Sequence, residues 1–598
     1  MISYTPPLRD MQFVMTELLD AAHILAAVPA HAEVDADLML QVLTEAGRFA
    51  AEVLFPLNAG GDREGCRFDH GAVRTPAGFA AAYRQFCEAG WPALACAPEH
   101  GGQGLPYLIN CALFEMLSAS NHAWTMYPGL LHGAYACLSR HADAQLQARY
   151  LPKIVSGEWL ATMCLTEAHA GSDLGLLRTR AREQDDGSYR ISGSKIFISG
   201  GEQDLTDNIV HLVLARLPQA PEGSKGLSLF LVPKWLPDGA RNTAHCTGIE
   251  HKMGIRGSAT CSMQFDDATG WLIGEPQRGL NAMFVMMNSA RLHVGAQGLG
   301  LADAAYQQAL AYARERLQSR AIDRKKDCPQ AADPIVSHPA VQRLLMKQRS
   351  YIEGGRMLAY WGALMLDLAE HHPDRSMQHL MHDRLGFITP VIKAMLTEQG
   401  FQGASDALQV FGGHGYICET GIEQYMRDAR ITMIYEGSNE IQGIDFMLRK
   451  VLADDGRLMH DFLAQIELTA AIEPAGALAP YARQLRELVR RLREATQAIA
   501  GKAPAAPRLP YLVAPEMLRL SGHAALAWLW LRAAVAASAN TAHDERFYRG
   551  KLDTACYYFT FVLPEVEQLL RVIDACLSNA GSDTQSAFPT DLYIQDAA

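Results

Sequence analysis

One carboxylate, Glu436, follows an apolar run and directly precedes a glycine. Gly437 would let a ligand approach the backbone closely, and Ser438 or Asn439 could cap a helix that begins there. A carboxylate in a dry pocket has a raised pKa, which suits a general base that removes a proton from a substrate. A solvated glutamate at a helix boundary would give the same pattern, so this segment alone leaves both interpretations open.

Two further segments contain residue types that can hold a cofactor. Residues 409–416 form a glycine-rich stretch between expected helices, and backbone N–H groups in such loops can meet phosphates or a cofactor edge. In residues 164–173 an expected strand leads into a Gly/Ser/Asp turn, where Thr166 and Ser172 offer hydroxyl groups to a heterocycle or a phosphate. Each segment also fits an ordinary connection. The second is not GxGxxG and no βαβ pattern surrounds it, which disfavours a Rossmann nucleotide domain.

The elements that must position these segments come in an unusual order. Residues 1–160 show helical apolar spacing, whereas residues 161–278 contain short strands rich in Val, Ile, Phe and Leu, with a hairpin signal among them. Residues 279–455 return to long amphipathic helices. Residues 456–598 are helical again, and a Pro/Ala-rich stretch at 503–510 divides them. We therefore predict an α+β protein of four domains with these boundaries.

The bulk composition disfavours several classes of partner. The 598 residues carry a formal net charge of -12, which argues against a protein whose main partner is nucleic acid. The 12 cysteines occur singly, without a CxxC pair or a Cys/His cluster, so we expect no metal site. The sequence shows no apolar run of ~18 residues and no secretory signal, from which we expect no integral membrane segment and a cytoplasmic location.

Taken together, the motifs resemble those of the acyl-CoA dehydrogenase family, over roughly residues 40–450. Residues 166–173 match the family's TE-x-x-x-GSD stretch, residues 409–416 its glycine-rich QxxGGxGY loop and residues 435–438 its YEG-T/S segment. Residues 98–104 are similar to its PE-x-x-GG-x-G loop. Several matches in the right order are far more specific than any one of them.

This resemblance implies a fold and a reaction. The fold has an N-terminal helical domain, a central β-barrel domain, a C-terminal four-helix bundle and, in this chain, an extra C-terminal helical domain. The reaction is the FAD-dependent α,β-dehydrogenation of an acyl-CoA thioester to the trans-2-enoyl-CoA. Glu436 matches the base that removes the α-proton while the β-hydrogen leaves as hydride to the flavin, and an electron-transfer flavoprotein is the implied electron acceptor.

The other site residues are also implied by the resemblance. Those matched to FAD contacts are Thr166, Ser172, Phe197, Ser199, Arg316, Gln409, Gly413, Ser438 and Glu440, of which Gln409 and Gly413 match contacts to the FAD of a neighbouring subunit. Those matched to substrate contacts are Ser172, Asn288, Arg291, Tyr435 and Gly437. The chain departs from the family shortly after Arg316, where it reads LQSR in place of the usual Phe-Gly pair.

The opening residues 4–11 and the tail after residue 455 resemble a larger bacterial branch of the family. Because such a tail would cover the surface through which shorter relatives form tetramers, we predict a homodimer. An acyl-CoA oxidase that passes electrons to oxygen is the nearest alternative. A DNA-binding or scaffold flavoprotein of the same fold is another, although acidic residues offset the arginines of the tail. The acyl group of the substrate stays open.

Overall fold

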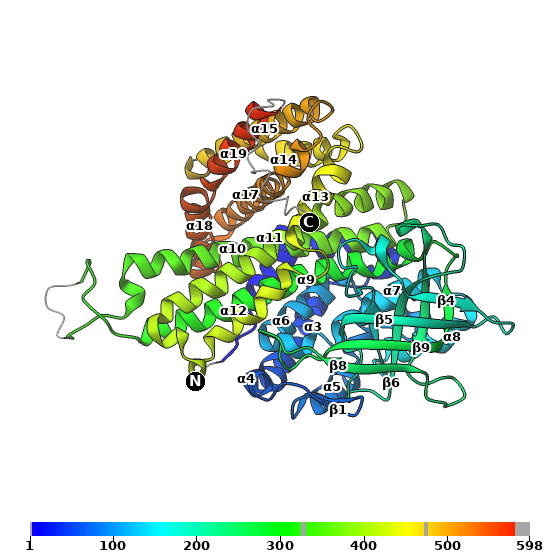
Figure 1. Ribbon diagram of the computed structural model, residues 1–598. Helices are drawn as coiled ribbons and strands as arrows, with labels where there is room; N and C mark the ends of the chain where they lie inside the picture. The colour runs from blue at the N-terminus through cyan, green and yellow to red at the C-terminus, as the bar shows by residue number, and fades with distance from the viewer. Residues whose placement is uncertain (1–2, 325–329, 472–475, 581–598) are drawn as a thin grey trace, which may run out of the picture. The chain divides into compact units, whose positions relative to one another are not determined.

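Figure 1 shows the computed structural model of the chain, which describes residues 3–324, 330–471 and 476–580. The chain divides into two compact units. Met1–Leu385 and Leu396–Gly437 form the first unit, and Gly386–Met395 with Ser438–Ala598 form the second. The predicted domain boundaries after residues 160, 278 and 455 stay predictions.

Helices fill the N-terminal part of the first unit, as predicted. They are α1 (Leu8–Gln12), α2 (Ala21–Ala26), α3 (Ala36–Arg48), α4 (Phe55–Glu64), α5 (Phe79–Glu88), α6 (Tyr107–Thr125), α7 (Leu131–His141) and α8 (Ala144–Val155), with a short hairpin of β1 (Arg67–Asp69) and β2 (Ala72–Arg74). α3 is capped by Asp35, whose carboxylate accepts a hydrogen bond from Leu38 N at 2.8 Å. Every residue of α6 is buried, so this helix forms the core of the region.

A barrel follows the N-terminal helices. Its strands are β3 (Trp159–Cys164), β4 (Arg180–Glu183), β5 (Tyr189–Ser199), β6 (Asn208–Arg216), β7 (Leu227–Pro233), β8 (Ala244–Ile249) and β9 (Thr260–Ile273). Their order is β3-β6-β4-β5-β9-β7 with β8 on β9, and β6 also pairs with β7, which closes β6, β4, β5, β9 and β7 into a ring. The predicted hairpin is confirmed, since β4 and β5 pair antiparallel across a short turn.

Long helices complete the first unit. They are α9 (Gly279–Glu315), α10 (Pro339–His371), α11 (Arg375–Phe411) and the shorter α12 (Ile422–Arg430), and Figure 1 shows the strands gathered apart from them. The middle of α11, Gly386–Met395, belongs to the second unit. α9 and α11 approach closely at Gly298 and Gly400, because a Cβ added to Gly400 would lie 2.6 Å from the Gly298 carbonyl oxygen. Bulkier side chains at either position would therefore force the two helices apart. This close approach fixes the position of α9 against α11, and α9 carries several of the predicted site residues.

The second unit is helical, which confirms the predicted extra region. Its helices are α13 (Asn439–Asp445), α14 (Arg457–Ala471), α15 (Ala479–Lys502), α16 (Leu509–Leu512), α17 (Ala514–Asn540), α18 (Glu545–Tyr557) and α19 (Glu565–Asn579). The Pro/Ala-rich stretch separates α15 from α16, as expected. Arginines of α15 are paired with acids, for example Arg490 with Glu487 and Glu494. Among the described helices, none is both long and apolar enough to cross a membrane.

Candidate active site

The backbone around Glu436 makes a sharp, left-handed turn. α12 leads into a 3-10 turn, Ile431–Met433, after which Glu436 has φ +55° and Gly437 has φ +85°. A left-handed conformation at a non-glycine residue costs about 1–3 kcal/mol and persists only where the surrounding structure determines it. Ser438 then caps α13, because its hydroxyl accepts a hydrogen bond from Ile441 N at 3.4 Å. The half-buried Glu436 carboxylate is thus carried by a short turn between two helices.

Tyr435 anchors this turn in the interior of the first unit. Its hydroxyl donates a hydrogen bond to Oε1 of Gln297 on α9 and lies 3.4 Å from Nε2 of His122 on α6. Burial, together with the nearby charge of Glu436, raises the pKa of the Tyr435 phenol well above its usual range. Tyr435 is therefore a neutral hydrogen-bond donor at physiological pH. The sequence did not single out Gln297 or His122, because nothing in a helical stretch shows which loop residue its side chains meet.

A second group of predicted residues meets at the edge of the barrel. Thr166 lies just beyond the end of β3, and its carbonyl accepts a hydrogen bond from Ile196 N on β5 at 2.9 Å. The pairing of β5 with β9 shifts between Lys195 and Ile198, and within this bulge Phe197 has φ +60° and leaves 59% of its surface exposed. Ser199 ends β5. The bulge thus exposes an aromatic ring one residue from Ile196, which binds the Thr166 carbonyl.

A buried ion pair ties the two segments of this group together. Lys195 Nζ lies 2.9 Å from Glu167 Oε1 and also donates to the Leu165 carbonyl, and both side chains are almost fully buried. Burial acts to raise the pKa of Glu167, but the Lys195 ammonium and hydrogen bonds from Thr179 and Arg178 N lower it to about 2. Sequence reasoning missed this pair. The signal was available, since Lys195 stands at an inward position of an alternating strand.

Two predicted substrate residues lie together on α9. Arg291 donates a hydrogen bond to Asn288 Oδ1 at 3.4 Å. Arg291 Nε is buried and has no hydrogen-bond partner in the described part of the chain. Buried donors are normally satisfied, so this group is suited to a ligand oxygen. Ser172 is exposed in the turn after β3, next to Asp173, which accepts a hydrogen bond from Gly175 N at 2.9 Å.

The remaining predicted residues fall in two other places. Arg316 is exposed at the end of α9. This end of the helix lies near the glycine-rich loop, since Tyr312 of α9 stacks on Phe411 at 4.2 Å between ring centroids and its hydroxyl lies 3.4 Å from His414 Nδ1. Gln409 and Gly413 are exposed at the end of α11 and in that loop, and Glu440 is exposed in the first turn of α13. The contacts thus gather the predicted residues into separate groups on the barrel, on α9, in the glycine-rich loop and at the Glu436 turn.

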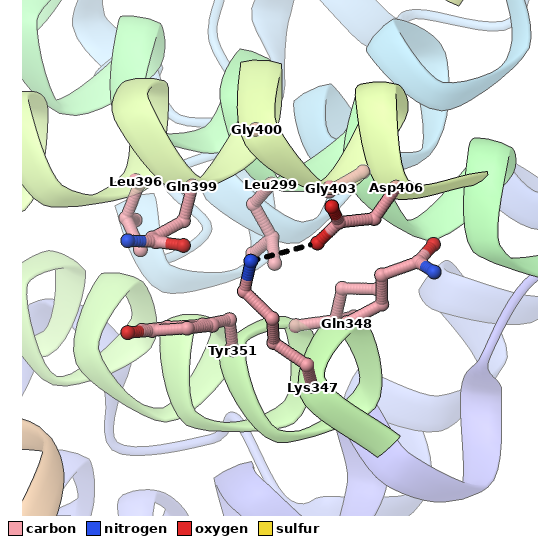
Figure 2. A pocket seen from close by; sticks show the side chains of 11 residues that line it. Leu299, Lys347, Gln348, Tyr351, Leu396, Gln399, Gly400, Gly403 and Asp406 are labelled. Atoms are coloured by element: carbon pink, nitrogen blue, oxygen red, sulfur yellow. Dashed lines mark ion pairs between the residues drawn. The ribbon is translucent and has the colours of Figure 1, made fainter. Parts of the chain in front are cut away.

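Two cavities of the described chain lie away from these groups. Figure 2 shows one between α9, α10 and α11, where Lys347 and Asp406 form an ion pair at 2.9 Å. Its volume of about 10 Å³ is close to that of one water-sized sphere, so it is too small for a cofactor. An open groove of about 540 Å³ lies over α3 and α5, lined by Val42, Phe49 and Trp91 among others. Neither includes a predicted site residue.

Comparison with known proteins gives four consecutive family matches. The N-terminal domain of acyl-CoA dehydrogenases matches residues 39–158, the middle domain residues 162–268, the C-terminal domain residues 277–450, and a domain described as acetyl-CoA dehydrogenase C-terminal like matches residues 462–580. The order of these matches follows the order of helical, barrel, helical and helical regions described above.

Relatives cover almost the whole chain. It is 42% identical over 578 residues to 3-methylmercaptopropionyl-CoA dehydrogenase of Ruegeria pomeroyi. The alignment covers 94% of this chain and 97% of that protein. It is also 33% identical over 618 residues to the broad-specificity linear acyl-CoA dehydrogenase FadE5 of Mycobacterium tuberculosis. That alignment covers 98% of this chain and 100% of that protein.

Solved structures share the fold at lower identity. ACDH-11 of Caenorhabditis elegans in complex with C11-CoA is 19% identical, with a TM-score of 0.79 over 98% of this chain and 96% of that one. An acyl-CoA dehydrogenase of Bacillus anthracis complexed with FAD is also 19% identical, with a TM-score of 0.74 over 94% of each chain. With relatives this similar along nearly its whole length, and the family's three domains in order, the chain belongs to the acyl-CoA dehydrogenase family.

Proposed function

We propose that the chain catalyses the FAD-dependent α,β-dehydrogenation of an acyl-CoA thioester to the trans-2-enoyl-CoA, with Glu436 as the base. The observation that carries this proposal is the left-handed Glu436–Gly437 turn beside the anchored Tyr435, since strained backbone concentrates at catalytic sites. In this reaction the Glu436 carboxylate accepts the α-proton. The Glu436 backbone N–H donates to the thioester carbonyl, where negative charge develops.

The residues at the barrel edge fit FAD. Phe197 holds a costly backbone conformation and exposes its ring, an arrangement that a stacked heterocycle would explain. Thr166, Phe197 and Ser199 would hold the flavin ring, and bound FAD supplies the hydride acceptor. The rest of the cofactor would meet Ser172, Arg316, Gln409, Gly413, Ser438 and Glu440. Asn288, Arg291 and the exposed Ser172 would meet the CoA part of the substrate.

Replacing Lys195 tests whether the Lys195–Glu167 ion pair holds the proposed flavin-binding segments at the barrel edge in place. Lys195→Met leaves the buried Glu167 charge without its cation, which we expect to cost about 3–5 kcal/mol of unfolding free energy. Because the pair joins the Thr166 and Phe197 segments, the variant should also lose flavin during purification. Urea unfolding and the ratio of flavin to protein absorbance measure both effects.

The matched control for this variant is Lys153→Met, which removes an exposed ion pair with Glu158 and should cost less than about 1 kcal/mol. The dependence of stability on pH below roughly 4.5 gives a second test. The depressed pKa of Glu167 stabilises the fold above its unfolded value of roughly 4.5, and this contribution is lost as the pH falls towards about 2. Without Lys195 the pKa of Glu167 should be depressed less, so the variant should lose less stability than the wild type as the pH falls below roughly 4.5. A Lys195→Met protein that retains its full content of bound FAD and has wild-type stability would contradict this account.

Anaerobic titration of the purified holoenzyme with a panel of acyl-CoAs tests the proposed reaction. The panel begins with 3-methylmercaptopropionyl-CoA and linear acyl-CoAs such as butyryl-CoA, because relatives are named for these substrates. Bleaching of the flavin band is the expected result, and its extent ranks the acyl groups. A protein with bound FAD that no acyl-CoA bleaches would refute dehydrogenation.

The electron acceptor separates the proposed activity from its nearest alternative. A dehydrogenase should pass its electrons to an electron-transfer flavoprotein or a substitute dye, and should form little hydrogen peroxide in air. An acyl-CoA oxidase would release hydrogen peroxide at a rate that matches enoyl-CoA formation. The cytoplasmic location stays a prediction.

We also propose that the protein is a homodimer. Large apolar side chains are exposed in the two segments that meet at the end of α9, where Tyr416 is 86% exposed and Leu317 50% exposed. Large apolar side chains exposed in neighbouring segments suit an interaction site. Light scattering should give the mass of two chains, and Tyr416→Asp should shift the mass towards one chain. A tetramer mass would overturn the proposal.

A further inference from the structure

The Glu436 turn needs an anchor on each side, because the left-handed conformation of a glutamate costs free energy and persists only where the surrounding structure determines it. Downstream, Ser438 caps α13. Upstream, the chain leaves its 3-10 turn with Tyr435 N donating to the Ile431 carbonyl at 3.1 Å. The Tyr435 side chain is therefore the last group before the turn that can fix its orientation.

The partner of Tyr435 is an unusual residue for its place. Gln297 is only 4% exposed, on a part of α9 whose other residues are mostly small or apolar. Burying an amide costs free energy unless it is hydrogen-bonded. The Gln297 carbonyl oxygen accepts a hydrogen bond from the Tyr435 hydroxyl. Within the described residues, the Gln297 amide nitrogen has only a long contact of 3.8 Å to Met126 Sδ. The hydrogen bond to Tyr435 is thus the main interaction that a glutamine gains at this position.

His122 completes the cluster from the opposite helix. Burial lowers its pKa to about 3, so the ring is neutral and carries one N–H. Because the single Tyr435 proton goes to Gln297, the 3.4 Å contact of His122 Nε2 with the phenol oxygen requires the proton to be on Nε2. The phenol therefore both donates and accepts, and two helices hold it.

We propose that Gln297, supported by His122, is a positioning residue that fixes Tyr435 and thereby orients the Glu436–Gly437 turn, from which the carboxylate reaches the substrate. The inference rests on the proposed role of Glu436 as the base. Gln297 acts through Tyr435 and touches no reacting atom in this scheme. A small displacement of a reacting group is enough to lower a rate by as much as ~100-fold, which gives the size of the expected effect.

Gln297→Leu is the first variant, and it removes the acceptor while keeping a side chain of similar volume. With the best acyl-CoA of the panel, kcat should fall roughly ten- to hundredfold with KM changed less than about threefold. The isotope effect of α-deuterated substrate on flavin reduction should rise, because proton removal becomes the slow step. Gln308→Leu is the matched control, since Gln308 is equally buried on α9 but donates to the Ser3 carbonyl at 2.6 Å. It should lower the melting temperature and leave kcat unchanged.

A double-mutant cycle with Tyr435→Phe tests whether Gln297 acts through Tyr435. If it does, Gln297→Leu should have little further effect on kcat in the Tyr435→Phe background. Effects that multiply, or a Gln297→Leu enzyme with wild-type kcat and isotope effect, would overturn the inference.

Hydrogen exchange of the holoenzyme without substrate separates this inference from the proposed reaction. Gln297→Leu should speed exchange of the amides at residues 434–438, and Gln308→Leu should not. Faster exchange in a protein that no acyl-CoA reduces would refute the reaction but support the anchor. Normal exchange in an active Gln297→Leu enzyme would support the reaction and refute the anchor.

Discussion

Glu436→Gln should leave the holoenzyme folded and flavin-loaded but unable to be reduced by acyl-CoA. The substitution keeps the size of the side chain but removes its negative charge and its ability to accept a proton at neutral pH. Loss of a general base costs typically about 10²–10⁴ in rate, so we expect the flavin reduction rate to fall by at least that range. Stopped-flow measurement of the flavin band under anaerobic conditions gives the rate directly.

Binding and catalysis should separate in this variant. The Gln297 to Tyr435 hydrogen bond does not involve the Glu436 carboxylate, so the turn should keep its orientation. Acyl-CoA should therefore still perturb the flavin spectrum without bleaching it. Asp455→Asn is the matched control, because Asp455 is an exposed acid with the same φ of +55° as Glu436. A Glu436→Gln enzyme that is reduced at the wild-type rate would remove Glu436 from the mechanism.

Arg356→Met should strongly destabilise the first unit. The Arg356 side chain is 1% exposed on α10 and forms ion pairs with Asp10, with Glu115 of α6 at 2.6 Å and with Asp303 of α9 at 3.8 Å. Removing one partner from a buried ion network costs about 3–5 kcal/mol, because the opposite charges stay buried without compensation. Thermal or urea unfolding of the holoenzyme measures the loss.

The control and the pH dependence sharpen this test. Arg349→Met on the same helix removes a less buried ion pair with Glu353, one turn away, and should cost less than Arg356→Met. Burial raises the pKa of Asp303 to about 7, although Arg356 lowers it. A folded-state pKa above the unfolded value means that this group's contribution to stability falls as the pH rises from roughly 4 to 7. Arg356→Met should raise the Asp303 pKa further, so the variant should be less impaired at pH 6 than at pH 8. Equal stability of the two variants would contradict this account.

The residues for which chemical roles are proposed could be singled out from the sequence because they are defined by type and local spacing. Glu436 before a glycine, the hydroxyls after β3 and the glycine-rich loop each lie within a few consecutive residues. Strand alternation and helical spacing are also local, so the helical, barrel, helical and helical order was predicted and is confirmed. The roles of the individual site residues stay proposals.

The tertiary structure decided what holds these residues in place. Lys195 meets Glu167 across 28 positions of sequence, Gln297 meets Tyr435 across 138, and Arg356 meets Glu115 across 241. A buried polar side chain must find a partner, but its own sequence neighbourhood does not say which one, because the partner is chosen by how distant elements pack. Local spacing therefore determined the elements and the reactive groups of this protein, whereas long-range packing determined the buried pairs that orient them.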